Sequence, residues 1–300
     1  NNLVLRRPIE SAPPQGGRGE PLSLLAVQPH PDDESIGMGG TLARYSAEGV
    51  RTTLVTATRG EVGEILDKDL DPKEAAPRLA TIREAELRNA VKILGVNELV
   101  FLGYEDSGMA GLPRNREPKT FWQADEEEAI GRLIQVVRRV RPQVMVTQNE
   151  FGGYAHPDHI KTHRVAIGAF FYASDAERFP GGEPFRPSKL YYGAFPKSLM
   201  RQMAEAMQRA GVENRFSTDG EPPPFAVSDD RVTTWLDVSP YIDKKLAAMR
   251  AHRTQIPEDS WFLKLNQALG PKAWSLETFE RVRSSVDAPT PEDDLFAGLR

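Results

Sequence analysis

The sequence predicts an α/β fold, a Rossmann-like and mostly parallel sheet flanked by helices, with a smaller C-terminal extension that walls the site at the strand ends. Short apolar runs without polar alternation, such as LSLLAV at 22–27, are typical of strands buried on both faces of a parallel sheet. Between these runs apolar residues recur at helical spacing, so that strands and helices alternate four times. Sites in this fold class collect at the carboxyl ends of the strands.

The elements of the first two thirds follow a regular order. Gly37, Gly39 and Gly40 are interpreted as a tight turn into the first helix, and Gly95 as the end of the second. Strands are expected at 22–28, 51–58, 98–102, 142–148 and 189–193, and helices at 41–48, 76–94, 124–140 and 157–173.

Regularity falls after residue 174, where two segments are rich in proline and glycine. Helices are expected there at 198–210, 240–252 and 259–269, with a strand at 232–238. We therefore divide the chain into a loose N-terminal arm (1–20), a catalytic core (21–195) and a C-terminal extension (196–300) packed on the core.

The composition limits the classes of function. A net charge of -5 argues against a nucleic-acid partner, which would need a basic face. Because the chain has no cysteine, a metal site would have to use His, Asp or Glu. No apolar run approaches the roughly 20 residues that span a bilayer. We expect a cytoplasmic protein without a membrane partner, and a homo-oligomer stays open.

Two polar clusters follow predicted strands. HPDDE at 30–34 places one imidazole and three carboxylates in five positions, and HPDH at 156–159 repeats its HPD pattern. Buried carboxylates are costly unless they are paired or bind a cation. The loops GEVGE at 60–64 and DSGMAG at 106–111 also follow strands. All four segments should therefore meet at one edge of the sheet.

The first cluster predicts part of a metal site. A catalytic zinc usually has three protein ligands and an open position for water. A turn can aim His30 and Asp33 at one ion, which leaves Asp32 free to act as a base on bound water. The third ligand must come from elsewhere in the chain.

The second cluster can supply that ligand. Pro157 suits the first turn of a helix, so His156 would be the N-cap and His159, inside the first turn, could complete the metal site. A rival pairing is His159 with His163, four residues apart on one helix face. The rival lacks the glutamate base of the zinc-binding HExxH motif.

These motifs together resemble the LmbE/PIG-L family of zinc-dependent N-acetylglucosaminyl deacetylases. The resemblance rests on PHPDDE at 29–34, the GG-T turn, the GExGE loop and GGYAHPDH at 152–159, and it covers 22–171 well and 245–255 more weakly. DSGMAG and GGYAHPDH resemble the branch that deacetylates the glucosaminyl-inositol precursor of mycothiol or cleaves mycothiol conjugates.

The resemblance implies a hydrolase that removes an N-acetyl group from an N-acetylglucosaminyl conjugate, a thiol precursor such as GlcNAc-inositol or GlcNAc-malate. It implies that a metal-activated water attacks the amide with Asp32 as general base. The implied ligands of zinc, or alternatively Fe²⁺, are His30, Asp33 and His159.

The resemblance also implies roles around the metal. His156 would be the electrophile or general acid near the developing oxyanion, and Tyr154 a mobile side chain that polarises the carbonyl. The implied substrate-contacting residues are Glu64, Arg83, Asp106, Met109 and Asn266.

Simpler interpretations stay open at this point. HPDDE could be an Asp-rich helix cap, His156 a purely structural cap, Tyr154 a packing residue and Arg83 a residue on a solvated helix face. The alternative functions are an amidase that cleaves thiol S-conjugates and a non-catalytic sugar-binding protein. The intact Asp32 favours catalysis, because a binding protein needs no base.

Overall fold

A computed structural model describes residues 21–209, 211, 223 and 225–300 of the chain. In these residues seven strands form one sheet in the order β3-β2-β1-β4-β5-β7-β6. Strands β1 to β5 are parallel, and β7 is antiparallel to both β5 and β6. The strands are β1 (Ser23–Gln28), β2 (Arg51–Thr56), β3 (Glu98–Phe101), β4 (Val144–Thr147), β5 (Lys189–Gly193), β6 (Thr234–Asp237) and β7 (Leu276–Ser284). The predicted α/β class is confirmed.

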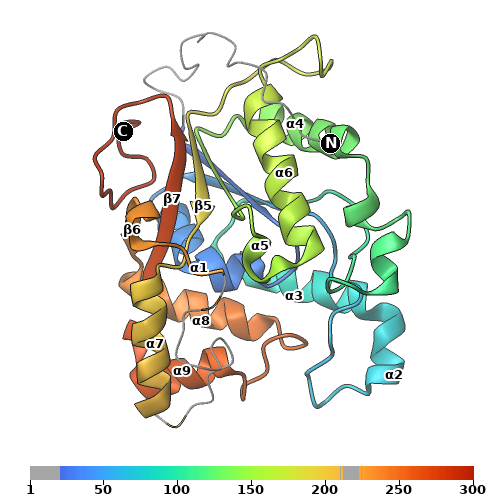
Figure 1. The fold of residues 1–300 in the computed structure, drawn as a ribbon, viewed down its shortest axis with the longest axis vertical. Coiled ribbons are helices and arrows are strands. Elements are labelled where there is room, and N and C mark those ends of the chain that lie inside the picture. The colour runs from blue at the N-terminus through green and yellow to red at the C-terminus, as the bar shows by residue number, and fades with distance from the viewer. Residues whose placement is uncertain (1–20, 210, 212–222, 224) are drawn as a thin grey trace.

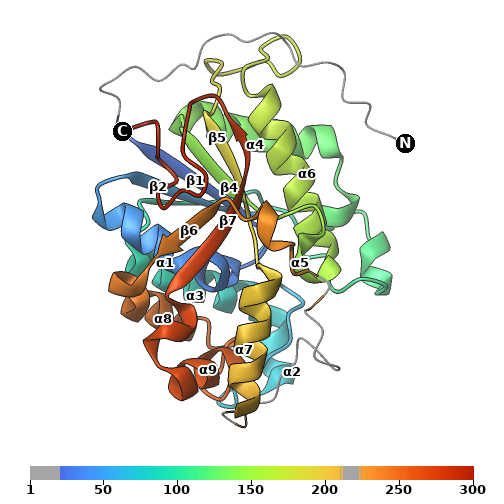
Figure 2. The same cartoon turned by 60° about the vertical axis from the view of Figure 1, so that its left-hand side comes forward.

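Helices cover both faces of this sheet. Helices α4 and α6 lie on one face, and α1, α3 and α8 on the other, with α7 and α9 beyond α8 (Figures 1 and 2). The helices are α1 (Asp33–Ala47), α2 (Pro72–Ala75), α3 (Leu79–Leu94), α4 (Glu126–Val140), α5 (Gly152–Ala155), α6 (Pro157–Tyr172), α7 (Lys197–Arg209), α8 (Ile242–Ala251) and α9 (Trp261–Leu269).

The apolar run in β1 contributes side chains to the hydrophobic cores on both faces of the sheet, because side chains alternate along a strand. Leu25 and Val27 join the core under α4 and α6, while Leu24 and Ala26 join the core under α1 and α3. All four side chains are buried. The run lacks polar alternation because the strand is covered on both faces.

The first helix begins earlier than predicted. Helix α1 starts at Asp33 rather than near residue 41, so the interpretation of the glycines as a turn is wrong. Gly40 instead allows close packing, because a Cβ there would lie 2.5 Å from Cγ2 of Val238. The helix breaks at Met38, where φ is -152° and ψ is 24°.

A second helical segment starts after that break. Glu277 accepts the backbone N–H groups of Gly40 and Thr41 at 2.9 and 2.7 Å. Lys245 in turn pairs with Glu277 at 2.5 Å. Glu277, a residue of β7, thus caps the second segment of α1. Local sequence cannot show this contact, because the two residues are far apart in the chain.

Strand β7 lies outside the elements predicted from sequence. Its sequence LETFERVRS mixes charged and apolar residues, and its pairing partners are β5 and β6. The C-terminal region predicted as an extension thus supplies two strands that hydrogen-bond to the core sheet. The predicted N-terminal arm at 1–20 lies outside the described residues.

The order of the strands fixes where a site can form. Chain order reverses between β1 and β4, which are neighbours in the sheet. Ligands of open α/β sheets bind in the crevice outside the carboxyl ends at such a switch point. HPDDE follows β1 and HPDH follows β4, so both clusters border this crevice. Among the described helices, none is long and apolar enough to cross a membrane.

Candidate active site

Three side chains with metal-ligating atoms meet at the crevice. His30 follows β1, Asp33 opens α1 and His159 lies in the first turn of α6. Asp33 Oδ2 lies 3.5 Å from His30 Nδ1 and 3.5 Å from His159 Nε2. Burial raises the pKa of Asp33, but His159 and His30 outweigh burial and hold that pKa below its ordinary value. Asp33 is therefore ionised, as a carboxylate ligand must be.

The ring of His159 fits a metal ligand. Both of its nitrogens are buried and have no hydrogen-bond partner in the described part of the chain. Burial lowers the pKa of His159 to about 4, so the ring is neutral and can coordinate a cation. Neighbouring ligand atoms in a tetrahedral zinc site lie roughly 3.3 Å apart. The two separations of 3.5 Å at Asp33 are close to that value, so this group could hold zinc.

Asp32 stands in an unusual backbone conformation beside this group. Its φ is 122°, which non-glycine residues rarely adopt. Its Oδ2 accepts a hydrogen bond from Arg83 Nη2 at 3.2 Å, and its side chain is 17% exposed, so a water can reach it. Burial raises the pKa of Asp32 to about 7, although the Arg83 guanidinium opposes the shift. A carboxyl with such a pKa suits proton transfer near neutral pH.

Arg83 is buried within α3, so its interpretation as a solvated face residue is wrong. It donates from Nη1 to the Gly60 carbonyl at 2.9 Å and from Nη2 to the Pro31 carbonyl. Arg83 therefore ties the GEVGE loop to the HPDDE turn. Helical periodicity could not identify it, because the inward position carries a charged residue whose partners come from distant loops. Its predicted contact with substrate stays a prediction.

His156 and Tyr154 flank the rings of the group. His156 is the N-cap of α6, as predicted, and its Nδ1 accepts the N–H of Asp158 at 3.1 Å. Burial lowers the pKa of His156 to about 4. The cap uses Nδ1, so Nε2 is the atom that can face a substrate. Tyr154 is 54% exposed, and its ring centroid lies 5.0 Å from that of His159.

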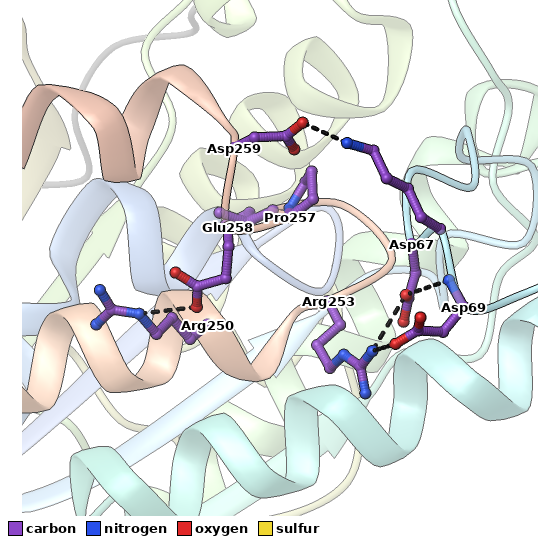
Figure 3. A pocket seen from close by; sticks show the side chains of 9 residues that line it. Asp67, Asp69, Arg250, Arg253, Pro257, Glu258 and Asp259 are labelled. Atoms are coloured by element: carbon purple, nitrogen blue, oxygen red, sulfur yellow. Dashed lines mark hydrogen bonds and ion pairs between the residues drawn. The ribbon is translucent and has the colours of Figure 1, made fainter.

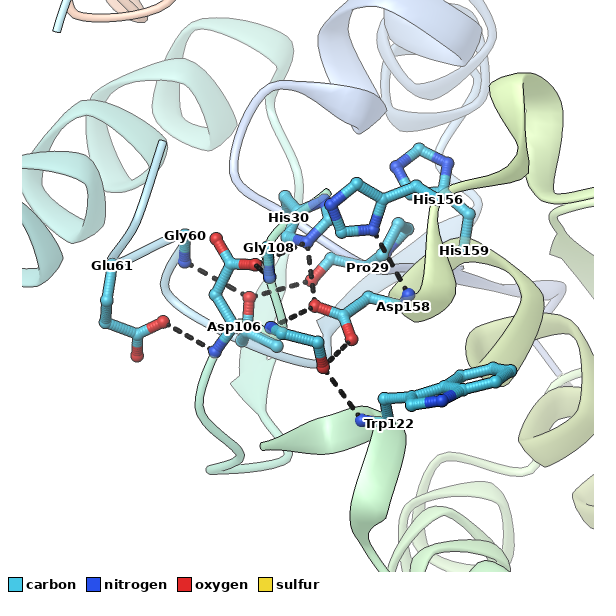
Figure 4. A network of polar contacts seen from close by, with 12 residues as sticks. Pro29, His30, Gly60, Glu61, Asp106, Gly108, Trp122, His156, Asp158 and His159 are labelled. Carbon is cyan, nitrogen blue, oxygen red and sulfur yellow. Dashed lines mark hydrogen bonds and ion pairs between the residues drawn. The ribbon is translucent and has the colours of Figure 1, made fainter. Parts of the chain in front are cut away.

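A buried network holds His30 from behind (Figure 4). His30 Nε2 lies 3.1 Å from Asp158 Oδ2, which also accepts the N–H of Ser107 at 2.9 Å. The Ser107 hydroxyl donates to the other oxygen of Asp158. Asp106 Oδ1 lies 3.6 Å from His30 Nε2. Because Nε2 faces these carboxylates, Nδ1 is the atom turned to Asp33.

Asp158 and Ser107 are site residues to which no role was given from sequence. The signals were present, since Asp158 is the acid of the repeated HPD pattern and Ser107 stands in DSGMAG. Among the described residues, the ligand atoms of His30, His156 and His159 lie within 4.8 Å of one another, and so do those of His30, Asp106 and Asp158. However, both oxygens of Asp158 already accept hydrogen bonds from the protein. In Asp33 only Oδ2 accepts such a bond among the described residues, from the His30 N–H at 3.0 Å, so the trio with Asp158 is the weaker metal candidate of the two carboxylate groups.

The other residues predicted to contact substrate belong to three separate segments of the chain. Glu64 and Met109 are exposed, and the Glu64 carbonyl accepts a hydrogen bond from Gln255 Nε2 at 2.8 Å. Asn266 lies in α9, and its buried Oδ1 has no hydrogen-bond partner among the described residues. Contact of these residues with substrate stays a prediction.

His163 contacts residues outside the metal-ligating group. Its Nδ1 lies 3.0 Å from the Gln148 carbonyl, and its ring packs edge-on against Tyr192. One nitrogen is thus engaged on the side of β5, which argues against the rival pairing of His159 with His163. His163 is instead a buried histidine that packs α6 on the sheet.

His163 should make stability depend on pH. Burial lowers the pKa of His163 below its ordinary value of 6.5, so the folded state resists its protonation. Its contribution is present above the unfolded pKa of 6.5 and is lost as pH falls through the folded pKa. We expect the free energy of unfolding to fall less between pH 7 and 5 in His163→Gln than in the wild-type protein. The glutamine amide can still donate to the Gln148 carbonyl. Urea denaturation at both pH values measures this, and equal losses in the two proteins would contradict it.

Two adjacent glycines provide a matched test of the loop that leads to His159. Gly152 and Gly153 have φ of 59° and 63°, so alanine is strained at both positions. Only at Gly152 would a Cβ collide with α6, at 2.7 Å from Ile160 N and 2.8 Å from His159 Cβ. Gly152→Ala should therefore weaken zinc binding more than Gly153→Ala, as measured by competition with a chelator. Equal affinities would show that this loop does not position His159.

A groove of about 350 Å³, lined by none of the metal-ligating residues, lies between residues 67–69 and 250–259 (Figure 3). Its charged side chains pair with one another. Lys68 Nζ lies 2.6 Å from Asp259 Oδ2, and Arg253 Nη2 lies 2.6 Å from Asp69 Oδ2. Exposed pairs of this kind contribute little to stability. These ion pairs thus connect two surface loops across the mouth of the groove. The charged side chains that line the groove are paired and do not form a cluster of one sign.

Comparison with known proteins identifies the family of this chain. The model of the PIG-L family, described as GlcNAc-PI de-N-acetylase, matches residues 25–170. A protein of Geodermatophilus obscurus named 1D-myo-inositol 2-acetamido-2-deoxy-alpha-D-glucopyranoside deacetylase is 46% identical over 286 residues, covering 92% of this chain and 97% of the relative.

Solved structures share the fold. The N,N'-diacetylchitobiose deacetylase of Pyrococcus horikoshii has a TM-score of 0.60 at 23% identity, over 87% of this chain and 84% of that chain. A conserved protein of Thermus thermophilus has a TM-score of 0.58 at 28% identity, over 89% of this chain and 98% of that chain. The chain thus belongs to the PIG-L family of de-N-acetylases, enzymes that hydrolyse an N-acetyl amide.

Proposed function

We propose that this enzyme is a zinc-dependent deacetylase of an N-acetylglucosaminyl conjugate, with GlcNAc-inositol as its substrate. The observation that carries the proposal is the group formed by His30, Asp33 and His159, with Asp32 beside it. The name of the Geodermatophilus relative supports this choice of substrate, because that protein is similar to this chain over nearly its whole length.

We assign His30 Nδ1, Asp33 Oδ2 and His159 Nε2 as the ligands of the metal. A zinc ion there would supply Lewis-acid polarisation of the amide carbonyl and lower the pKa of a water toward roughly 7. The same two histidines and one carboxylate also suit Fe²⁺. Asp158, itself held by Ser107, keeps the His30 ring in the orientation that turns Nδ1 to Asp33.

The remaining side chains divide the proton transfers. Asp32 takes the proton of the attacking water, and Arg83 holds its carboxylate in place. His156 Nε2 and the Tyr154 hydroxyl would stabilise the oxyanion, and one such donor is typically worth about 3 kcal/mol. Asp32 then returns that proton to the leaving nitrogen as the amide C–N bond breaks, which releases acetate and a free amine.

Acetate release tests the proposal against the alternative of an amidase. The zinc-loaded protein is given GlcNAc-inositol in one assay and an S-conjugate of N-acylated glucosaminyl-inositol in another, with acetate and free amine quantified in both. We expect GlcNAc-inositol to yield equal amounts of acetate and amine. We also expect its kcat/KM to be higher than that of the S-conjugate. Preferential cleavage of the bulkier acyl group would identify an amidase, and turnover of neither substrate would reject the proposal.

A further inference from the structure

We propose that the buried pair Glu34–His252 positions Asp32 for its work as the base. Glu34 accepts the backbone N–H of Asp32, and His252, from the far end of the chain, holds the Glu34 carboxylate in place. The proposal rests on the proposed function, because it concerns the base of that reaction. Neither Glu34 nor His252 has a role in the metal group described above.

The Glu34 carboxylate is engaged on both of its oxygens. Oε2 accepts the N–H of Asp32 at 3.0 Å. Oε1 accepts the hydroxyl of Ser35 at 2.5 Å and lies 2.7 Å from Nε2 of His252. Glu34 is fully buried, although it stands in the first turn of α1, where an acidic side chain could otherwise extend into solvent. Its position is explained by these partners and not by solvation.

His252 uses its Nε2 atom to hydrogen-bond Glu34. It is fully buried at the C-cap of α8, and within the described residues its other ring nitrogen, Nδ1, has no hydrogen-bond partner. The backbone around it is anchored, since the His252 carbonyl accepts the N–H groups of Gln255 and Ile256 at 3.0 and 2.7 Å. His252 is thus a fixed donor from the C-terminal region to a carboxylate next to the site.

Asp32 needs such support. A non-glycine residue at φ 122° is strained and persists only where its surroundings determine the conformation. The Asp32 carbonyl accepts the N–H groups of Ser35 and Ile36 at 3.0 Å each, and Arg83 holds its side chain. The bond to Glu34 fixes the remaining backbone group, the N–H. Without it, rotation at Asp32 would carry the carboxylate away from the attacking water.

Variants at His252 test this through kcat. His252→Leu removes the donor, whereas His252→Gln places an amide nitrogen close to where Nε2 stood. We expect kcat for acetate release to fall on the order of 10- to 100-fold in His252→Leu, with KM and one zinc per chain retained, and to recover largely in His252→Gln. His163→Gln, a change at another buried histidine, should leave kcat unaltered. An unchanged kcat in His252→Leu, or a loss that follows KM or zinc content, would overturn the proposal.

Glu34 variants cover the case in which His252→Leu does not fold, because they remove the buried carboxylate itself rather than leave it without His252. Glu34→Gln keeps an acceptor for the Asp32 N–H and Glu34→Met does not, so kcat should be at least about tenfold lower in Glu34→Met. Equal kcat values would overturn the proposal.

A crystal structure of Glu34→Met separates this proposal from the proposed function, since it does not depend on turnover. Asp32 should leave its φ of 122° in that variant. Retention of this φ would refute positioning by Glu34, whereas absence of acetate release from the wild-type protein would refute only the deacetylase assignment.

Discussion

Replacement of Asp32 by asparagine should lower kcat for deacetylation by about 10²- to 10⁴-fold, the usual contribution of a positioned general base. Asparagine has nearly the same shape and can still accept the hydrogen bond from Arg83, but it cannot take a proton from water. Since Asp32 is not among the proposed ligands, the variant should still bind one zinc ion per chain. Steady-state acetate release and metal analysis of the same preparation measure both quantities.

The separation of rate from metal content is the decisive feature of this variant. Loss of zinc from Asp32→Asn would show that Asp32 is a ligand and would overturn the division of roles within HPDDE. A wild-type rate with zinc bound would show that another group accepts the proton.

Replacement of His159 by alanine should remove the metal itself. Even residues behind metal ligands contribute 10- to 100-fold to affinity, so loss of a ligand should weaken zinc binding by more than about 100-fold. The rate should fall about 10³-fold or more, because several kcal/mol of transition-state stabilisation depend on the metal. Zinc affinity by chelator competition and acetate release at saturating substrate measure the two effects.

His163 supplies the control for that change, since it lies one turn further along the same helix. His163→Gln should bind zinc as the wild-type protein does, because its ring contacts Gln148 and Tyr192 rather than Asp33. Loss of zinc from His163→Gln with retention in His159→Ala would restore the rival assignment of the ligands.

The sheet and the meeting of the two clusters were predictable from sequence for a physical reason. The run in β1 lacks polar alternation because both of its faces are covered, and a parallel sheet puts all its strand ends at one edge. Proline in the second position of HPDH indicated a helix start, which placed His156 at the cap and His159 in the first turn.

Features that depend on distant partners were not predictable. Gly40 reads locally as a turn residue, but its lack of a side chain serves close packing against Val238, almost 200 positions away. Arg83 reads as a surface residue of α3 until the GEVGE loop and the HPDDE turn close over it. Strand β7 acquires its structure from β5 and β6 rather than from an apolar pattern of its own.

Glu34 shows the same limit within the motif that sequence described best. Sequence placed it at the start of a helix, where acidic residues are common and need no further explanation. Its buried partner His252 stands 218 residues later, so no local pattern could join them. The strained φ of Asp32, which that pair supports, is likewise a property of the folded chain alone.

The central claim, a single metal held by His30, Asp33 and His159 that is required for hydrolysis, is tested most directly by titration of metal-free protein with zinc. Acetate release from GlcNAc-inositol is followed at each addition. The rate should rise in proportion to added zinc and level off at one equivalent per chain, and the chelated protein should be inactive. Full activity in the chelated protein, or a rate that levels off only at two equivalents, would contradict the claim.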